Sequence, residues 1–154
     1  LQLIPDALEA MVPTATRHAH RVVFVCTQNS ARSQLAVAVW ERRSSIPAAS
    51  AGTHPAATVH PRAVAAARRR KLPMHPQTPQ HLDDVVSSTD LVIAVCDNAH
   101  EELSPDIRRI HWSIPDPVAA GGNQAFDRVL DDITHRIDRI AATLPTPEQR
   151  TAHA

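Results

Sequence analysis

The sequence lacks net charge, because 16 basic residues balance 16 acidic ones among its 154 residues. No overall field therefore draws the chain to a nucleic acid or an anionic membrane, and any anion site has to come from local geometry. Long hydrophobic runs are also missing: no stretch approaches the roughly 20 apolar residues that span a bilayer, and no signal-peptide pattern opens the sequence. We expect a cytoplasmic domain that binds neither nucleic acid nor membrane.

Cysteine is scarce, with Cys26 and Cys96 the only two in the sequence. In a cytoplasmic chain such cysteines are more often free or catalytic thiols than a structural disulfide. The ten histidines are scattered, and the one close pair, His18 and His20, has no cysteine or carboxylate beside it. Because metal sites need clustered ligands, we expect no bound metal.

The length suits one domain with a sizeable core, between two less regular ends. Residues 1–20 are expected to form an N-terminal extension, with a short helix at 7–11 followed by a linker rich in Pro, Thr and His. Residues 21–145 form the predicted domain, and residues 146–154 a polar, flexible tail. Since the sequence begins at Leu1 rather than Met, a domain taken from a longer protein is one expectation.

Short apolar runs alternate with helical periodicities along the predicted domain. Strands are expected at 21–25, 48–51, 91–95 and 107–112, and helices at 33–43, 60–72, 98–103 and 126–144. This alternation predicts an α/β fold, a three-layer sandwich with a four-stranded parallel sheet. Ligands of such sheets bind beyond the carboxyl ends of the strands, and Cys26, Cys96 and Asp116 each follow a predicted strand.

One loop between a predicted strand and a helix has the chemistry of an oxyanion site. It begins at Cys26 and continues with Thr27, Gln28, Asn29, Ser30, Ala31, Arg32 and Ser33. Backbone N–H groups at a helix entry attract an anion, and the same field stabilises the thiolate of Cys26. The planar guanidinium group of Arg32 can donate hydrogen bonds to two oxygens of the anion. Ser33 is expected to hydrogen-bond to the sulfur, and Asn29 to adopt the left-handed geometry that a tight loop requires.

Asp116 is the candidate general acid. A carboxyl group beside an anion site retains its proton because of neighbouring negative charge and partial burial, and it can then protonate a leaving oxygen as the thiolate attacks. Pro115 and Pro117 stiffen the segment. Taken alone, Pro-Asp-Pro is also an ordinary turn sequence.

Four segments in the right order resemble the low-molecular-weight protein tyrosine phosphatase superfamily, and most closely its arsenate reductases. The segments are 26–33, 50–53, 89–93 and 114–117, the last preceded by His111 and Trp112. The resemblance covers about residues 21–144 and implies the low-molecular-weight phosphatase fold. It implies Cys26 as nucleophile, Arg32 as oxyanion ligand, Asp116 as acid, and Ser50 as a support of the loop through Asn29.

An arsenate reductase is the first functional hypothesis. Cys26 attacks arsenate, and Cys96 then forms a disulfide with Cys26 and releases arsenite. The resemblance implies a third cysteine in thioredoxin-coupled members, but residues 97–102 contain none. The external reductant is then a thioredoxin-like protein or a small thiol, either mycothiol with mycoredoxin or glutathione with glutaredoxin. Alternatively, Cys96 is only a buried cysteine at a strand end.

Two other hypotheses stay open. A protein tyrosine phosphatase would hydrolyse phosphate monoesters through a phosphocysteine on the same residues. Phosphatases of the family usually place an aromatic residue after the acid's Asp-Pro pair, where this chain has Val118, and the chain has no tyrosine. A small oxyanion, arsenate or phosphate, is therefore favoured. The third hypothesis is an oxyanion-binding regulatory domain, similar to the C-terminal half of arsenical-resistance repressor fusions.

Overall fold

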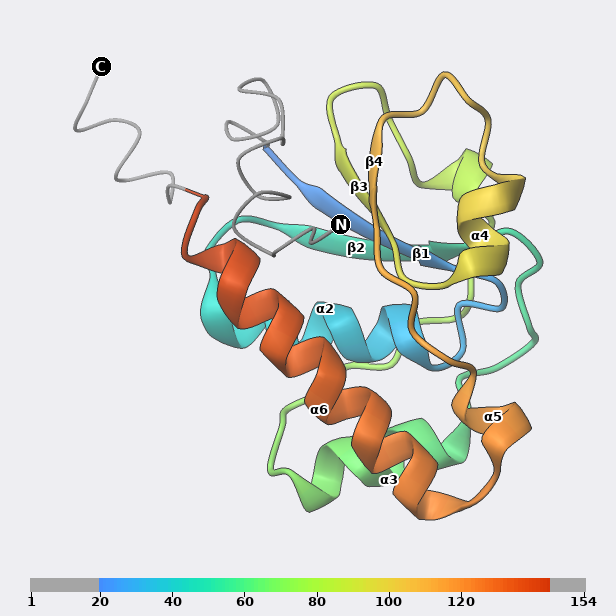
Figure 1. Cartoon of the computed structure of the whole chain (residues 1–154), viewed down its shortest axis with the longest axis vertical. Helices are drawn as coiled ribbons and strands as arrows, with labels where there is room; N and C mark the ends of the chain where they lie inside the picture. Colours follow the sequence, from blue (N-terminus) through green and yellow to red (C-terminus); the bar gives the residue numbers. More distant parts are fainter. Residues whose placement is uncertain (1–19, 145–154) are drawn as a thin grey trace, which may run out of the picture.

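The computed structural model describes residues 20–144 and shows one sheet with helices packed around it (Figure 1). The helix expected at 7–11 and the tail expected at 146–154 lie outside the described residues. No helix within the described part of the chain is both long and apolar enough to cross a bilayer.

The sheet has four parallel strands in the order β2-β1-β3-β4. The strands are β1 (Val22–Cys26), β2 (Ala48–Gly52), β3 (Leu91–Ala94) and β4 (Arg109–His111). The predicted α/β fold with a four-stranded parallel sheet is thus confirmed, and the strand boundaries agree with the expected ones to within about two residues at each end. Strand β1 ends at Cys26 and β3 ends two residues before Cys96, and these two strands are neighbours in the sheet.

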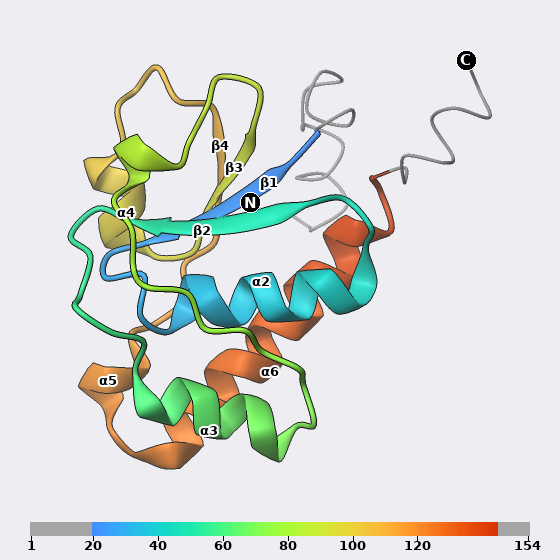
Figure 2. The ribbon, with the colours of Figure 1, turned by 180° about the vertical axis from the view of Figure 1, so that it is seen from behind.

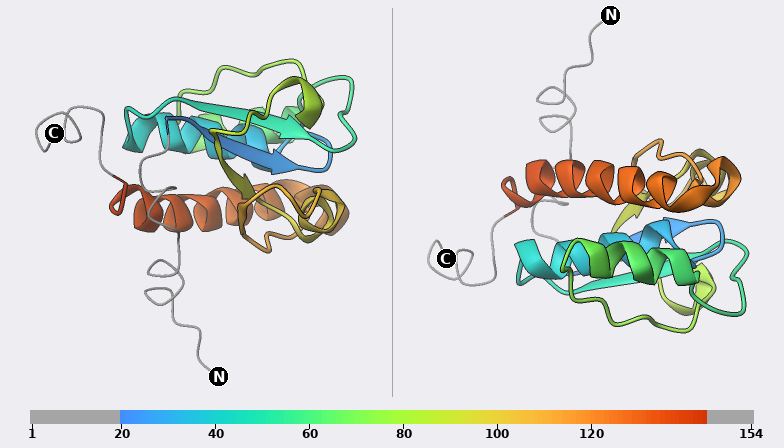
Figure 3. Two further views of the ribbon diagram at one scale, coloured as in Figure 1. Left: turned by 90° about the horizontal axis from the view of Figure 1, so that it is seen from above. Right: turned by 90° about the horizontal axis from the view of Figure 1, so that it is seen from below.

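Helices cover the sheet unequally. Within residues 20–144 they are α2 (Arg32–Arg43), α3 (Pro61–Arg69), α4 (Asp97–Glu102), α5 (Pro117–Ala120) and α6 (Gly122–Ala141), together with the 3₁₀ turn η2 (Leu82–Asp84). Helices α2 and α6 lie on one face of the sheet and α4 on the other, while α3 packs against α2 and α6 on the side away from the strands (Figures 1 and 2). The views from above and below show the same layering (Figure 3).

The two central strands form because their apolar side chains are buried on both faces. Every residue of β1 and β3 is buried. Phe24 of β1 makes an edge contact with Trp40 of α2, with ring centroids 6.0 Å apart, and a tilted contact with Trp112 at 6.1 Å. The indole N–H of Trp40 donates to the Ile46 carbonyl oxygen at 2.8 Å, so its polar group stays satisfied inside the core.

Helix α6 follows the predicted apolar periodicity, but it begins at Gly122, earlier than expected. Its buried face consists of Ala125, Phe126, Val129, Leu130, Ile133, Ile137 and Ile140. Burial of each large side chain contributes about 1.5–3 kcal/mol, so this face anchors the helix against α2 and the sheet. Two short elements, η2 and α5, were not expected, since neither is long enough to show a period.

Candidate active site

The sulfur of Cys26 lies at the carboxyl end of β1 and is almost completely buried. It accepts a hydrogen bond from the Asn29 N–H at 3.2 Å and lies 3.0 Å from the Ser33 hydroxyl. The Asn29 side-chain amide donates to the same hydroxyl at 2.7 Å, which leaves the Ser33 hydrogen free to point at the sulfur. The expected Ser33–Cys26 contact is present, and the Asn29 N–H and the Ser33 hydroxyl both face the sulfur.

Asn29 holds the turn of this loop in a left-handed conformation, with φ of 52°, as expected for the tight loop. Its side-chain oxygen accepts from the Gln80 N–H at 3.0 Å. From the other side Gly52 packs directly on the loop: a Cβ there would lie 2.6 Å from the Thr27 carbonyl oxygen and 3.0 Å from the Asn29 nitrogen. Only glycine therefore fits at the end of β2, a constraint that no local sequence signal revealed.

The loop is further fixed by the segment that follows β2. Backbone N–H groups of Thr53, His54, Ala56 and His60 donate in turn to the carbonyl oxygens of Cys26, Thr27, Gln28 and Ser30 at 2.7–3.1 Å. Because these carbonyl groups are occupied on the outside, the loop is held in one shape before any ligand arrives, which lowers the entropic cost of binding.

Helix α2 begins at Arg32, with Ala31 as its N-cap and no side-chain cap. Its first turn contains no acidic residue, so the unpaired N–H groups of the helix start face the loop without a competing carboxylate. The Arg32 guanidinium is half-buried and donates to the Ile114 carbonyl oxygen at 2.8 Å. The loop, the helix start and this cation together have the donors that a tetrahedral oxyanion requires, and their role in binding one stays a prediction.

Asp116 lies two residues beyond Ile114, as the N-cap of α5. Its carboxylate accepts from the Val118 N–H at 2.9 Å. The partial burial expected for this carboxyl group is wrong, because Asp116 is exposed: it caps a four-residue helix at the surface. Val118, two residues further on, is 45% exposed.

Cys96 follows β3 and is buried, with a free thiol. Its sulfur accepts from the Ala99 N–H at 3.4 Å, as the N-cap of α4, and lies 3.5 Å from the Thr27 hydroxyl. Thr27 directly follows Cys26, so Cys96 contacts the loop at the residue next to Cys26. The structure thus brings Cys26, Arg32, Cys96 and the Asp116 segment to one edge of the sheet, and the catalytic roles assigned to them stay predictions.

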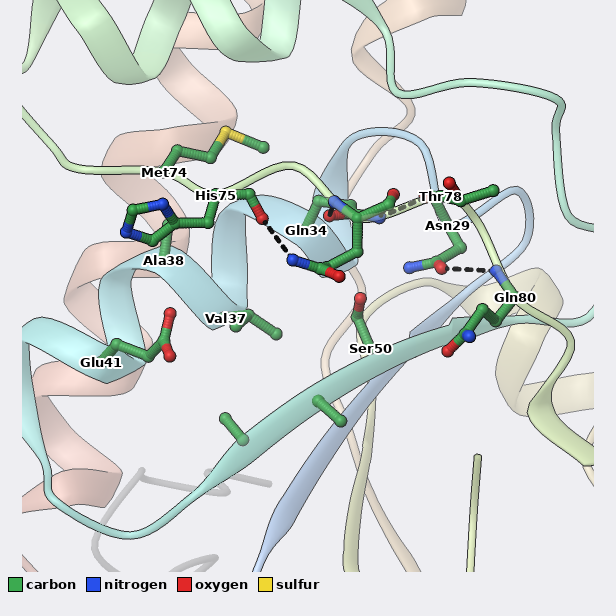
Figure 4. Close-up of a pocket in the computed structure, with 13 residues that line it drawn as sticks. Asn29, Gln34, Val37, Ala38, Glu41, Ser50, Met74, His75, Thr78 and Gln80 are labelled. Atoms are coloured by element: carbon green, nitrogen blue, oxygen red, sulfur yellow. Dashed lines mark hydrogen bonds between the residues drawn. The ribbon is translucent and has the colours of Figure 1, made fainter. Parts of the chain in front are cut away.

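A cavity of about 290 Å³ lies behind the loop, between α2, β2 and the segment 74–80 (Figure 4). Ser50 points into it from β2, and Asn29 borders it from the loop. Among the described residues, the Asn29 side chain bonds Ser33 and Gln80, and the Ser50 hydroxyl has no hydrogen-bond partner. The role of Ser50 as a support of the loop therefore stays a prediction.

Gln34 ties the loop to the segment 74–80, a contact that sequence reasoning missed. Its amide group donates to the carbonyl oxygens of Asn29 at 3.1 Å and of Gln77 at 2.8 Å, and it accepts from the Gln77 N–H at 3.2 Å. Gln34 is buried, which makes these bonds costly to break. Residues 74–80 show no hydrophobic periodicity, and no sequence pattern predicts the hydrogen bonds between Gln34 and this segment.

A second polar cluster flanks α4. The rings of His100 and His111 stack 4.0 Å apart, and His111 lies 2.8 Å from the Asp97 carboxylate. Burial, followed by the neighbouring His111 and Arg109, lowers the pKa of His100. Hydrogen bonds from Ser113 and then His111 lower the pKa of Asp97. Within residues 20–144, no group of three or more His, Cys, Asp or Glu side chains has a metal-binding arrangement.

Comparison with known proteins places this site in a family. Residues 21–150 match the model of the low molecular weight phosphotyrosine protein phosphatases, and the chain belongs to this family. Among curated relatives, the arsenate reductase of Bacillus licheniformis is 35% identical over 136 residues, covering 79% of this chain and 95% of that protein. The arsenate reductase of Bacillus subtilis strain 168 is 32% identical over 134 residues, with the same coverage.

Solved structures agree with this assignment. An arsenate reductase from Archaeoglobus fulgidus superposes with a TM-score of 0.69 at 29% identity, over 79% of this chain and 98% of that one. The tyrosine phosphatase Wzb from Escherichia coli K30, solved with sulphate, has a TM-score of 0.74 at 20% identity, over 82% and 99%, and shares the fold. These relatives are enzymes, and the expectation of an enzyme of the arsenate reductase and phosphatase family is confirmed.

Proposed function

We propose that this chain is a cytoplasmic arsenate reductase that works through Cys26 and Cys96. The observation that carries the proposal is the position of the two thiols: Cys26 lies inside the oxyanion loop, and Cys96 contacts the next residue, Thr27, at 3.5 Å. A hydrolase needs only the first thiol. The curated arsenate reductases that match at 35% and 33% identity support the same activity.

In the first step the Cys26 thiolate attacks the arsenic atom of arsenate. An S–As bond forms, an As–O bond breaks, and Asp116 gives a proton to the departing oxygen, which leaves as water. Arg32 and the N–H groups of the loop neutralise the remaining oxygens. Arsenic stays pentavalent in this step.

In the second step the Cys96 thiolate attacks the sulfur of Cys26. The S–S bond forms and the S–As bond breaks, so the electron pair of that bond passes to arsenic. Pentavalent arsenic is reduced to arsenite while the two thiols are oxidised to a disulfide. An external thiol reductant, either a thioredoxin-like protein or a small thiol with its glutaredoxin or mycoredoxin, then restores both thiols.

The matching family model makes phosphate-ester hydrolysis the second candidate. Cys26, Arg32 and Asp116 would serve it equally, with a phosphocysteine that water hydrolyses. The exposed Val118 beside the acid offers no aromatic wall for a phosphotyrosine ring, which supports a small oxyanion instead.

The test is the mass of the fully reduced protein before and after one incubation with arsenate. We expect a loss of about two mass units, because forming one disulfide bond removes two hydrogen atoms. We also expect a disulfide-linked peptide that contains Cys26 and Cys96. Cys96→Ser is the matched control and should lose no mass. An unchanged wild-type mass, together with rapid turnover of an aryl phosphate, would reject the reductase that works through Cys26 and Cys96 and favour the phosphatase.

A second measurement tests whether Asp116 acts as the general acid. Asp116→Asn should slow attack on esters with poor leaving groups by about 100-fold, because proton transfer contributes that much when the leaving oxygen is basic. Activated aryl phosphates should lose far less. Equal losses on both ester types would remove Asp116 from the acid role.

A further inference from the structure

A chain of polar contacts connects the thiol of Cys96 to a carboxylate at the far end of α4. The Thr27 hydroxyl lies 3.5 Å from the Cys96 sulfur. The Asn98 side-chain amide donates to that hydroxyl at 3.1 Å and also to the carboxylate of Glu102. Glu102 is held in turn by Thr53 and His54, from the segment that follows β2.

The chemistry of these groups sets the direction of the two hydrogen bonds that Asn98 makes. A carboxylate offers only acceptors, so Glu102 requires the NH₂ side of the Asn98 amide to face it. The same NH₂ group has a second hydrogen, which points at the Thr27 oxygen. The Thr27 hydroxyl, held by this bond, has its hydrogen available to the Cys96 sulfur, which as a thiolate can only accept.

We infer that Asn98 and Glu102 are positioning residues that orient the Thr27 hydroxyl toward Cys96 and so stabilise the Cys96 thiolate. The inference rests on the proposed function, since it concerns the reactivity of the second thiol. The Ala99 N–H at 3.4 Å supplies the other donor to this sulfur. Cys96 is 2% exposed, so water cannot replace a lost donor easily.

Other charged groups near Cys96 are already engaged elsewhere. Asp97 pairs with His111, and His100 accepts from Arg109, both toward β4. Glu101 on the same helix is exposed. His54 pairs with Glu102. Cys26, the residue before Thr27, is bonded to Asn29 and Ser33.

The test is the rate of alkylation of Cys96 by iodoacetamide as a function of pH, followed by intact mass in a Cys26→Ser background. Asn98→Ala and Glu102→Ala should each move the pH of half-maximal rate upward by about one unit, equal to a roughly tenfold lower rate at fixed pH below the midpoint. The plateau rate at high pH should change little. Glu101→Ala is the matched control on the same helix and should leave the profile in place.

A double-variant cycle separates orientation of the hydroxyl from a general loosening of α4. In a Thr27→Val background, Asn98→Ala should cause no further shift, because no hydroxyl remains to orient, whereas Thr27→Ser should retain the full Asn98 effect. An equal shift in the Thr27→Val background would overturn the inference. Faster alkylation at every pH, the sign of a frayed helix, would also overturn it. Arsenate-induced disulfide formation in the wild type is measured separately, so failure here leaves the proposed function standing.

Discussion

The guanidinium of Arg32 donates a hydrogen bond to the carbonyl oxygen of Ile114, 2.8 Å away. This bond joins the first turn of α2 to the segment that carries Asp116, so the cation that would bind the oxyanion also fixes the segment of the proposed acid. Movement of the Arg32 side chain is therefore coupled to movement of the segment that carries Asp116.

Replacing Arg32 by lysine should show this double role. Lysine keeps the charge but lacks the planar fork, so it cannot bind two oxygens and the Ile114 carbonyl group together. We expect Arg32→Lys to lower kcat/KM by about 100-fold or more, equal to ~2.7 kcal/mol of transition-state stabilisation. Steady-state kinetics check this, with the exposed Arg128→Lys as control. Unchanged kcat/KM would show that Arg32 is only structural.

Gly52→Ala should damage the loop without touching any reactive group. The added methyl group would lie 2.6 Å from the Thr27 carbonyl oxygen, and backbone cannot yield as a side-chain end can. We expect a loss of about 1–3 kcal/mol in the free energy of unfolding, together with reduced activity. Urea unfolding measures the first.

Gly121→Ala is the matched control for that substitution. A Cβ at Gly121 meets nothing within 4 Å, and only its φ of 79° is strained. Its stability cost should be about 1 kcal/mol. A Gly52→Ala protein as stable and as active as wild type would contradict the packing argument.

The ion pair of Arg21 and Asp90 should make stability depend on acid pH. Burial raises the pKa of Asp90, but hydrogen bonds from Arg21 and Ser87 and the Arg21 charge more than offset it, so the pKa lies below its ordinary value. A lowered folded-state pKa contributes stability above the unfolded value of about 3.9, and this stability is lost as the pH falls through the folded value.

Asp90→Asn should therefore destabilise the protein by about 2 kcal/mol at pH 7, since bonds to a charged group are lost, and by much less near pH 3. Urea unfolding at both pH values is the measurement. Asp138→Asn removes the partner of Arg43 in an exposed pair and should cost under about 1 kcal/mol. A pH-independent effect of Asp90→Asn would refute the linkage.

His100 should shape the stability near neutral pH. Burial, then His111 and Arg109, lower its pKa, so the unfolded chain takes up the proton first as the pH falls. Stability from this group is complete above about pH 6.5 and declines as the pH drops toward the folded-state pKa. His100→Gln should flatten the decline between pH 7.5 and 5.5, measured by urea unfolding. Replacing the exposed His135 by glutamine should leave the decline unchanged. An equal effect of both substitutions would show that His100 is not the source of the pH dependence.

Much of the site was predictable from the sequence, because its key residues are adjacent in it. Cys26, Asn29, Arg32 and Ser33 lie within one turn between a buried strand and a helix, and the Cys26–Ser33 contact and the left-handed Asn29 follow from that local order. The strands β1 and β3 were equally clear, because continuous apolar runs have few alternatives to burial in a parallel sheet.

The remainder depends on contacts between distant segments. The packing of Gly52 on Thr27, the clamp of Gln34 on Gln77 and the contact of Thr27 with Cys96 join residues 25 to 69 positions apart. None has a local period or motif, so only the folded chain shows them. The exposure of Asp116 was missed for the same reason, since burial is set by what packs around the segment rather than by its own residues.

The contact between the end of β2 and residues 80–81 also affects how molecules of this protein meet one another. Strand β2 is the outer strand of the sheet beside β1, yet the Gly52 N–H donates to the Gln80 carbonyl oxygen at 2.9 Å, and Gly52 forms a parallel bridge with His81. A strand from a second chain cannot pair with backbone groups that are already occupied. The segment that holds the loop after β1 thus also protects this end of the sheet edge from strand addition and aggregation.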